Sequence, residues 1–379
     1  MFRHCRRPVG LLLLTSGLLL PGGRLRGADP EPVRVAARGR PELVFACDRP
    51  TDQLDGLFTP VVVADLVALH AGVALSTEDF SAARAAAAER LEHAGIPLTA
   101  WLVLPRDQGY YVNTDNAGAT ADQYAAFDRW SRAHDLHWAA IGLDIEPSLT
   151  EFAALQDHRA RLVALLLRRA CDGGRVVRAR ADYATLIRRM QAGGYRVQTY
   201  QLPFIADERA AHTTLLERVL GLVDVRGDEE VLMLYSSFNH QSGAGMLWAY
   251  GPAAQAIAVG STARSGDAAA DALMPPLNWE EFSRDVVVAA HFSRTVGVYS
   301  LEGCVQQGFL PRLRTLDWSA PVVLPAAAIE RAGAFRARVH RGLWLGSHLP
   351  WLAGGSLLLV GAGVGLWGRR RRHRRAVAA

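Results

Sequence analysis

The sequence predicts an α/β protein folded as one closed (β/α)8 TIM barrel, with a signal segment before the barrel and a transmembrane helix after it. Short runs rich in β-branched residues alternate with longer amphipathic runs, and eight such units fit within residues 29–340. Strands that alternate with helices form parallel sheets. Eight units spread over roughly 280 residues match the length of a closed barrel.

Eight segments combine strand length with β-branched or aromatic residues. They are Leu43–Cys47, Gly72–Ser76, Leu98–Leu104, Ala139–Ile145, Arg196–Leu202, Val231–Ser236, Ala256–Gly260 and Thr295–Ser300. Helical stretches separate them, such as Asp79–His93, for which Ser76 and Thr77 are candidate caps. The fourth and fifth strands are separated by a double helical stretch, Glu151–Ala170 and Ala181–Ala192.

An open, doubly wound sheet is the competing arrangement of the same elements. Nucleotide-binding sheets of that kind carry a Gly-rich loop after the first strand. Here the first strand is followed by Asp48-Arg49-Pro50. We therefore expect the closed barrel.

Residues 1–28 have the layout of a secretory signal peptide. Arg3, Arg6 and Arg7 precede an apolar run, Val9–Leu20, which ends at a Pro-Gly-Gly breaker. Two fates stay open for this segment: cleavage, for example after Ala28, or retention as an uncleaved anchor.

Residues Leu349–Gly368 form an uncharged run of 20 residues, near the length that a helix needs to cross a hydrocarbon core of ~30 Å. The arginine-rich segment 369–379 follows, and such basic flanks remain cytoplasmic. We expect a single-pass protein of the cytoplasmic membrane whose barrel lies outside the cytoplasm, in the periplasm or at the cell surface. Proteolytic removal of the C-terminal segment as a sorting tag is the open alternative.

The formal net charge of +5 comes from the two ends of the chain. Residues 1–28 hold five arginines and residues 369–379 hold six, with no acid in either, so the stretch between them carries about −6. This acidic stretch gives no electrostatic motive for binding nucleic acid. Because the sequence has no C-x-x-C pair and no His/Cys cluster, we expect neither a metal site nor a cofactor.

Three cysteines remain outside the signal segment. Cys47 and Cys304 fall near the carboxyl ends of the first and eighth strands, which are neighbours in a closed barrel. Under oxidising conditions the two are candidates for a disulfide that closes the barrel. Two unpaired buried thiols are the alternative, and Cys171 is expected to be free.

The fourth strand carries the strongest signal for chemistry. Asp144 and Glu146 are two residues apart, so they share one face of the strand, and the alternating residues Ile141, Leu143 and Ile145 share the other. In barrels of this type catalytic groups gather at the carboxyl ends of the strands. Two neighbouring acids repel, which raises the pKa of one of them. A protonated Glu beside an ionised Asp suits acid catalysis of glycosidic cleavage.

The run Asp144–Glu146 resembles the end of the D-x-x-D-x-D-x-E signature on the fourth strand of chitinase-type glycoside hydrolases, the family 18 group. Gly142 and Ala139 stand where the signature has its two upstream acids. Met233–Tyr235 is similar to the family's Met-x-Tyr on the sixth strand. Tyr299 lies in the region where the family's eighth strand carries an aromatic residue. Lysozymes of the family 25 type share the Asp-x-Glu element.

The resemblance implies that Glu146 is the general acid. Asp144 would steady the substrate's N-acetyl group as that group attacks the anomeric carbon, and Tyr235 would assist. A second mechanism uses Glu302, at the end of the eighth strand, as nucleophile or base opposite Glu146. Carboxylate separation then distinguishes retention, at ~5 Å, from inversion, at ~6.5–9.5 Å.

Other strand ends carry side chains that suit a sugar ligand, because aromatic faces stack on sugar rings while amides and carboxylates bind hydroxyls. The candidate substrate-binding residues are Asp48, Tyr110, Tyr111, Asn113, Gln201 and Tyr299. We therefore expect a membrane-anchored glycoside hydrolase-like barrel that acts on cell-surface or extracellular carbohydrate. The alternative is a catalytically inactive barrel that binds a glycan or a partner protein, since the fold alone does not fix the function.

Overall fold

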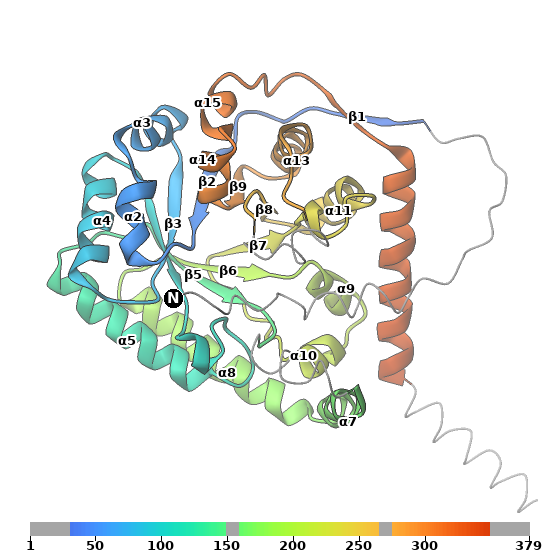
Figure 1. Cartoon of the computed structure of the whole chain (residues 1–379). Coiled ribbons are helices and arrows are strands. Elements are labelled where there is room, and N and C mark those ends of the chain that lie inside the picture. The colour runs from blue at the N-terminus through green and yellow to red at the C-terminus, as the bar shows by residue number, and fades with distance from the viewer. Residues whose placement is uncertain (1–30, 149–158, 265–274, 349–379) are drawn as a thin grey trace, which may run out of the picture.

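The computed structural model describes residues 31–148, 159–264 and 275–348. Eight parallel strands in this part of the chain close into a barrel in sequence order (Figure 1). They are β2 (Glu42–Cys47), β3 (Gly72–Ser76), β4 (Leu98–Leu102), β5 (Ala140–Ile145), β6 (Val197–Gln201), β7 (Glu229–Met233), β8 (Ala256–Gly260) and β9 (Thr295–Tyr299). The predicted barrel is confirmed, and each observed strand overlaps a predicted one.

The pairing of β2 with β9 closes the barrel. The register runs from Glu42 opposite Thr295 to Ala46 opposite Tyr299. Tyr299 and the residues that follow β2 therefore lie at the same end of the barrel, which is the end where the other strands also finish.

Helices surround the strands (Figure 1). They are α2 (Thr51–Leu57), α3 (Pro60–Leu69), α4 (Ala82–His93), α5 (Ala117–Ala133), α7 (Arg159–Ala170), α8 (Gly173–Ala192), α9 (Phe204–Ala210), α10 (Leu215–Leu220), α11 (Gly243–Tyr250), α13 (Trp279–Phe292), α14 (Leu301–Gln306) and α15 (Phe309–Arg314). Residues 326–348 form a further helix at the side of the barrel. Short 3-10 turns are η1 (Arg106–Gln108), η2 (Ser236–Phe238) and η3 (Gly251–Ala253).

Two helix starts differ from the sequence prediction. Helix α4 is capped by Ser81, whose hydroxyl accepts the Arg84 N–H, and not by Ser76 or Thr77. Helix α8 begins at Gly173, before the predicted start at residue 181, because the Asp172 carboxylate accepts the Arg175 N–H at 3.1 Å. A capped helix end satisfies backbone donors that would otherwise lack partners.

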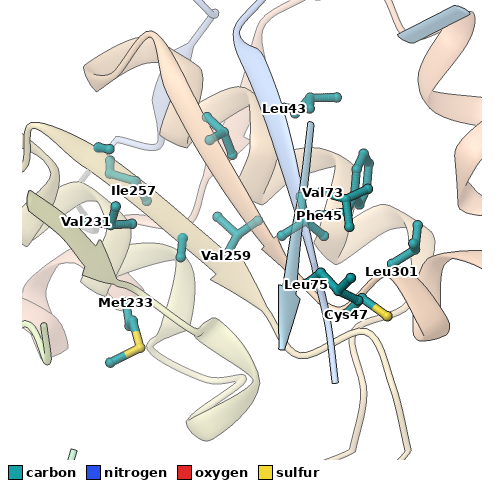
Figure 2. Close-up of a cluster of buried hydrophobic side chains, with 14 of the residues drawn as sticks. Leu43, Phe45, Cys47, Val73, Leu75, Val231, Met233, Ile257, Val259 and Leu301 are labelled. Atoms are coloured by element: carbon teal, nitrogen blue, oxygen red, sulfur yellow. The ribbon is translucent and has the colours of Figure 1, made fainter. Parts of the chain in front are cut away.

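The main core lies between the barrel and its helices. Leu43, Phe45 and Cys47 of β2 are fully buried on the outer face of the sheet, and Val73 and Leu75 of β3 continue this layer (Figure 2). Burial of side chains of this size stabilises the fold by about 1.5–3 kcal/mol each. This layer holds the strand ends at fixed positions.

A two-stranded antiparallel sheet outside the barrel was not predicted. Strand β1 (Val33–Val35) pairs with β10 (Val322–Leu324), with Val33 opposite Leu324. The pair joins the segment that enters the barrel to the segment that leaves it.

The helix over residues 326–348 is bound to the barrel by specific contacts. The Arg336 guanidinium donates to Asp207 at 2.7 Å and to the Ala249 carbonyl, and it lies 4.5 Å from the centre of the Tyr250 ring. A Cβ at Gly245 would lie 2.1 Å from the Ala328 carbonyl oxygen. The glycine is therefore needed for α11 to approach this helix.

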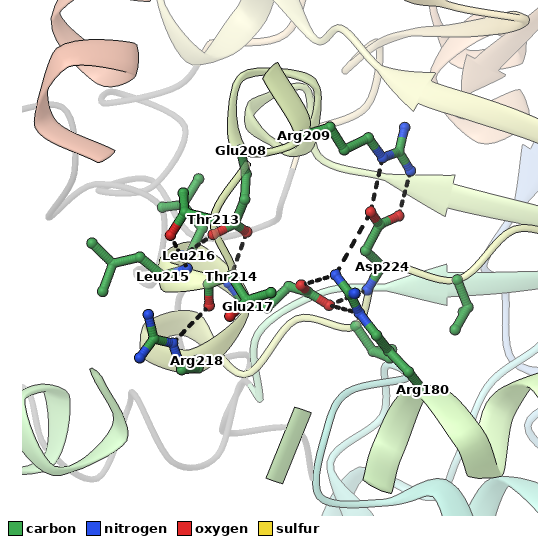
Figure 3. Close-up of polar contacts among 12 residues, drawn as sticks. Arg180, Glu208, Arg209, Thr213, Thr214, Leu215, Leu216, Glu217, Arg218 and Asp224 are labelled. Carbon is green, nitrogen blue, oxygen red and sulfur yellow. Dashed lines mark hydrogen bonds and ion pairs between the residues drawn. The ribbon is translucent and has the colours of Figure 1, made fainter. Parts of the chain in front are cut away.

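Buried acids hold the segment between β6 and β7 (Figure 3). The Glu208 carboxylate accepts the N–H groups of Leu216 and Glu217 at 2.6 and 3.0 Å, at the start of α10. Glu217 in turn pairs with Arg180 of α8 and accepts the Asp224 N–H at 2.6 Å. These bonds fix α10 against α8.

The two targeting segments predicted from the sequence, residues 1–28 and 349–368, lie outside the described residues. Among the helices that the structure describes, none has the length and apolarity of a membrane span.

Candidate active site

Asp144 and Glu146 lie at the carboxyl end of β5, where the loop after β4 holds the backbone. The Val112 N–H donates to the Asp144 carbonyl at 2.9 Å, and the Glu146 N–H donates to the Val112 carbonyl at 3.1 Å. These two bonds extend the sheet by one bridge between Val112 and Ile145. The end of β5 is therefore fixed on both sides of Ile145, between Asp144 and Glu146.

The inner and outer faces of β5 alternate as the sequence predicts. Ile141, Leu143 and Ile145 are fully buried in the main core. On the other face, a Cβ at Gly142 would lie 3.0 Å from the Tyr200 ring. Asp144 follows Gly142 on this inner face, and it is almost completely buried.

The two carboxyl groups of this pair hold protons more tightly than usual. Burial raises the pKa of Glu146 to about 7. Burial raises the pKa of Asp144 well above its ordinary value, and the charges of Glu146 and Asp48 add to the effect, against a hydrogen bond from Trp101. The Asp144 Oδ1 atom is buried without a partner in the described structure. A carboxyl group with a pKa near neutrality is suited to general acid catalysis.

Asp48, directly after β2, adds a third carboxylate. The Tyr110 hydroxyl donates to Asp48 Oδ1, and the Asp48 N–H donates to Glu302 Oε1 at 2.7 Å. Burial raises the pKa of Asp48 to about 6, with the charge of Glu302 acting in the same direction and the Tyr110 hydrogen bond acting against it. Asp48 and Tyr110 thus form one hydrogen-bonded unit beside the Asp144 charge.

Glu302 lies in the first turn of α14, not at a strand end. Strand β9 ends at Tyr299, and Ser300 caps the helix by accepting the Gly303 N–H. Glu302 is only 6% exposed, and its Oε1 atom is engaged by Asp48. The other oxygen, Oε2, is buried without a partner in the described structure. The structure therefore joins Glu302 to the backbone of Asp48.

Aromatic rings surround the carboxylates. Tyr235 and Tyr299 stack with ring centres 5.8 Å apart, and Trp101 meets Tyr299 edge-on at 6.2 Å. Tyr110 and Tyr111 also meet edge-on, at 4.9 Å.

The tyrosine hydroxyl groups around the carboxylates remain neutral. Burial, and then the charges of Asp144 and Glu146, raise the pKa of Tyr235 well above its ordinary value. Burial, followed by the charge of Glu146, does the same to the pKa of Tyr111. Neutral phenols offer O–H donors and flat apolar faces, the two features that a sugar ring can use.

Two predicted substrate-binding residues have structural roles. The Asn113 side chain donates to the Tyr111 carbonyl and accepts the Asp115 N–H, so it shapes the loop after β4. Gln201 is fully buried, and its amide donates to the Val223 carbonyl at 3.2 Å. Both side chains are thus engaged by backbone groups, and their role in binding substrate stays a prediction.

The predicted disulfide between Cys47 and Cys304 is not formed. Both residues are free thiols, fully buried, and Cys304 lies in α14 and donates to the Thr262 hydroxyl at 3.7 Å. Burial raises the pKa of each thiol. A buried neutral thiol packs as a small apolar side chain. Cys171 is free and exposed, as expected.

Tyr200 and Trp101 belong to the site but were not predicted as site residues. Tyr200 lies opposite Asp144 in the register of β5 and β6, and the charge of Asp144 contributes to the raised pKa of Tyr200. The alternation of β6 contains this signal, since Tyr200 and Gln201 point to opposite faces. Trp101 is inward for the same reason on β4.

No group of three or more His, Cys, Asp or Glu side chains in the described ranges is arranged to hold a metal ion.

Comparison with known proteins gives fold-level likenesses only. No family model and no curated protein matches the chain. Among solved structures, the glycoside hydrolase domain of PgaB (BpsB) from Bordetella bronchiseptica is similar at 12% identity and a TM-score of 0.44, over 73% of this chain and 98% of that domain. A D-allulose 3-epimerase from Methylomonas sp. aligns at 11% identity and a TM-score of 0.38, over 79% of this chain and 99% of the enzyme. SrfJ from Salmonella typhimurium aligns at 11% identity and a TM-score of 0.36, over 72% of this chain and 69% of SrfJ.

Proposed function

We propose that the protein is a glycoside hydrolase that acts on cell-surface or extracellular carbohydrate, with Glu146 as the general acid. The observation that carries the proposal is the pair formed by the buried Asp144 and the half-buried Glu146, surrounded by neutral tyrosines at the carboxyl end of the barrel. The pKa of Glu146, about 7, leaves a large share of this carboxyl protonated at neutral pH. Proton donation to a glycosidic oxygen needs such a group.

The arrangement favours a substrate-assisted reaction on an N-acetylated sugar. Glu146 donates its proton to the leaving oxygen, and the substrate's acetamido oxygen attacks the anomeric carbon. The unpartnered Oδ1 of Asp144 holds the acetamido N–H, and the Tyr235 hydroxyl binds the acetamido oxygen. The attack of the acetamido oxygen forms a five-membered ring on the sugar. Water then attacks the anomeric carbon and opens this ring, and Glu146 takes a proton from that water.

Glu302 suits the second mechanism less well. Its Oε1 atom already accepts the Asp48 N–H, and α14 buries the side chain. A nucleophile must reach the anomeric carbon. We therefore assign Glu302 a role in positioning Asp48.

The proposal also includes the membrane. The uncharged run Leu349–Gly368 and the arginines of residues 369–379 support a C-terminal anchor, and residues 1–28 support export. In this arrangement the barrel stands outside the cytoplasm, on a single-pass anchor.

The decisive experiment compares the full-length protein with its Glu146→Gln variant on chitin and peptidoglycan fragments and on aryl glycosides of N-acetylated and plain sugars. On natural glycans, whose leaving groups need a proton, the variant should lose ~10²–10⁴-fold in kcat/KM. On aryl glycosides with a nitrophenolate leaving group the loss should be smaller, because this group leaves without a proton.

Glu208→Gln is the matched control, because Glu208 is buried with a raised pKa but lies in the α9–α10 network. It should retain wild-type turnover. If neither the wild type nor the variants hydrolyse any substrate while the wild type still binds a glycan fragment, the protein is a glycan-binding barrel and the enzymatic proposal is wrong.

A further inference from the structure

The outward face of α7 combines exposed apolar and basic side chains. Val163 and Leu167 are 54% and 66% exposed, and Arg161 and Arg168 are exposed beside them. The helix contains four arginines and no acid. Within the described part of the chain, no carboxylate pairs with Arg161 or Arg168.

The end of the helix over residues 326–348 continues this surface. Helix α10 packs against α7, and a Cβ at Gly346 would lie 2.6 Å from the Leu215 side chain of α10. Trp344 and Leu345 are 45% and 48% exposed in this same region. Figure 1 shows α7, α10 and the end of the helix at one corner of the molecule.

The surface adjoins the predicted membrane span. Leu349 follows Leu345 by four residues, so even a fully extended chain separates the two by no more than ~14 Å. The uncharged run of 20 residues starts at Leu349. A surface this close to a membrane anchor lies within reach of the lipid headgroups.

We propose that the exposed faces of α7 and of residues 341–348, which we call the basic–apolar surface, rest on anionic lipid. The inference rests on the proposed anchor at Leu349–Gly368. Interfacial helices bind such membranes by inserting apolar side chains while arginines pair with the phosphates. The inserted apolar side chains would be those of Val163, Leu167 and Trp344. The phosphates would pair with Arg161 and Arg168.

The contact also orients the barrel. Arg169 of α7 pairs with Asp115 at 3.2 Å, and Asp115 belongs to the loop after β4 that carries Tyr110 and Tyr111. The basic–apolar surface therefore lies on the same edge of the barrel as the candidate active site. Substrate would be taken from the layer next to the membrane.

The test uses the full-length protein in nanodiscs, with an environment-sensitive fluorophore on single cysteines. Cys5→Ser and Cys171→Ser remove two native thiols, and Cys47 and Cys304 are fully buried. Labels replace Val163, or Val61 on α3 as the control, which is 71% exposed on another side of the barrel. Nanodiscs contain phosphatidylcholine alone or mixed with phosphatidylglycerol, with nitroxide lipid as quencher.

We expect nitroxide quenching and blue-shifted emission at residue 163 in the anionic nanodiscs, and neither at residue 61. Arg168→Glu should weaken the contact by roughly fivefold or more. Equal quenching at residues 163 and 61 would overturn the proposal, as would quenching that ignores both the lipid charge and Arg168→Glu. A blue shift without quenching would overturn it too, because a protein, such as a second copy of the chain, would then cover α7.

A label at Leu358 reports on the anchor separately. Quenching there without quenching at residue 163 keeps the anchor and rejects the lipid contact. Quenching at residue 163 without quenching at Leu358 supports the lipid contact and rejects the anchor.

Discussion

Glu146 owes its chemistry to the lack of a compensating charge. Several structural carboxylates elsewhere in the protein are paired with arginine, as Asp207 is with Arg336 and Asp224 is with Arg209. No arginine in the described residues forms an ion pair with Glu146. Burial therefore favours its neutral form, and the neutral form is the one that can donate a proton.

The activity should decline above about pH 7. The pKa of Glu146 is raised to about 7, so its acid form is lost as the pH rises through this value. Beyond it, kcat/KM should fall about tenfold per pH unit. Initial rates between pH 5 and 10 on a natural glycan measure this descending limb of the pH–rate profile.

Two variants test the assignment of this limb. Glu146→Gln should abolish the limb in whatever activity remains, whereas Glu208→Gln should keep it in place. A limb that persists unchanged in Glu146→Gln would assign the titration to another group.

The prediction of the site was limited by how accurately the alternation of inward and outward side chains along each strand can be read from the sequence. Alternation on β5 was enough to bring Asp144 and Glu146 to one face, because Ile141, Leu143 and Ile145 mark the opposite face. On β6 the prediction named Gln201, which is buried against the Val223 carbonyl, whereas the neighbouring Tyr200 lies opposite Asp144. Glu302 was assigned to a strand end, but the strand stops at Tyr299 and Ser300 starts a helix.

At the scale of elements, local pattern was sufficient for the barrel strands but not for long-range pairing. Most of the barrel strands are compact apolar runs, such as Gly72–Ser76 and Ala256–Gly260, so they are visible in the sequence. The three-residue strands β1 and β10 are too short for such a signal, and their pairing joins distant parts of the chain. Helix caps such as Asp172 depend on side-chain geometry, which the sequence pattern does not contain. For this reason α8 starts before the predicted residue 181.

The helix over residues 326–348 should depend on Arg336. Replacing it with Ala leaves Asp207, which is 2% exposed, with only the Tyr250 hydroxyl as a donor. Breaking such a pair should destabilise the protein by about 2–4 kcal/mol, which is less than for a fully buried pair because Arg336 is partly exposed.

Chemical denaturation, followed by tryptophan fluorescence, measures this loss. Arg341→Ala on the same helix, whose exposed side chain bonds to the Ala337 carbonyl one turn back, is the comparison variant. Asp207→Asn in the Arg336→Ala background should recover part of the stability. An Arg336→Ala protein as stable as the wild type would mean that the helix is held without this ion pair.

At the scale of the whole molecule, buried acids bind several segments together and also make the fold sensitive to pH. Glu208 fixes the start of α10, Asp48 accepts the Tyr110 hydroxyl of the loop after β4, and Asp144 lies one residue before the end of β5. The pKa of each of these carboxyl groups is raised in the folded protein, chiefly by burial. All three thus act in the same direction on the stability.

The free energy of unfolding should therefore be greater near pH 5 than near pH 9. A carboxyl whose pKa is raised on folding stabilises the folded state below its unfolded pKa, and this contribution is lost as the pH rises through the folded value.

For Glu208 the window runs from an ordinary pKa of 4.5 to about 8. Glu208→Gln keeps an oxygen for one of the two N–H groups that the Glu208 carboxylate accepts, those of Leu216 and Glu217, and loses the acceptor for the other. Because residue 208 then no longer titrates, the variant should flatten the pH dependence of the stability. Urea unfolding of both proteins at pH 5, 7 and 9 measures the effect, with Glu280→Gln on the exposed start of α13 as the control. A stability that rises from pH 5 to pH 9 in the wild type would show that these carboxyl groups ionise at little cost within the fold.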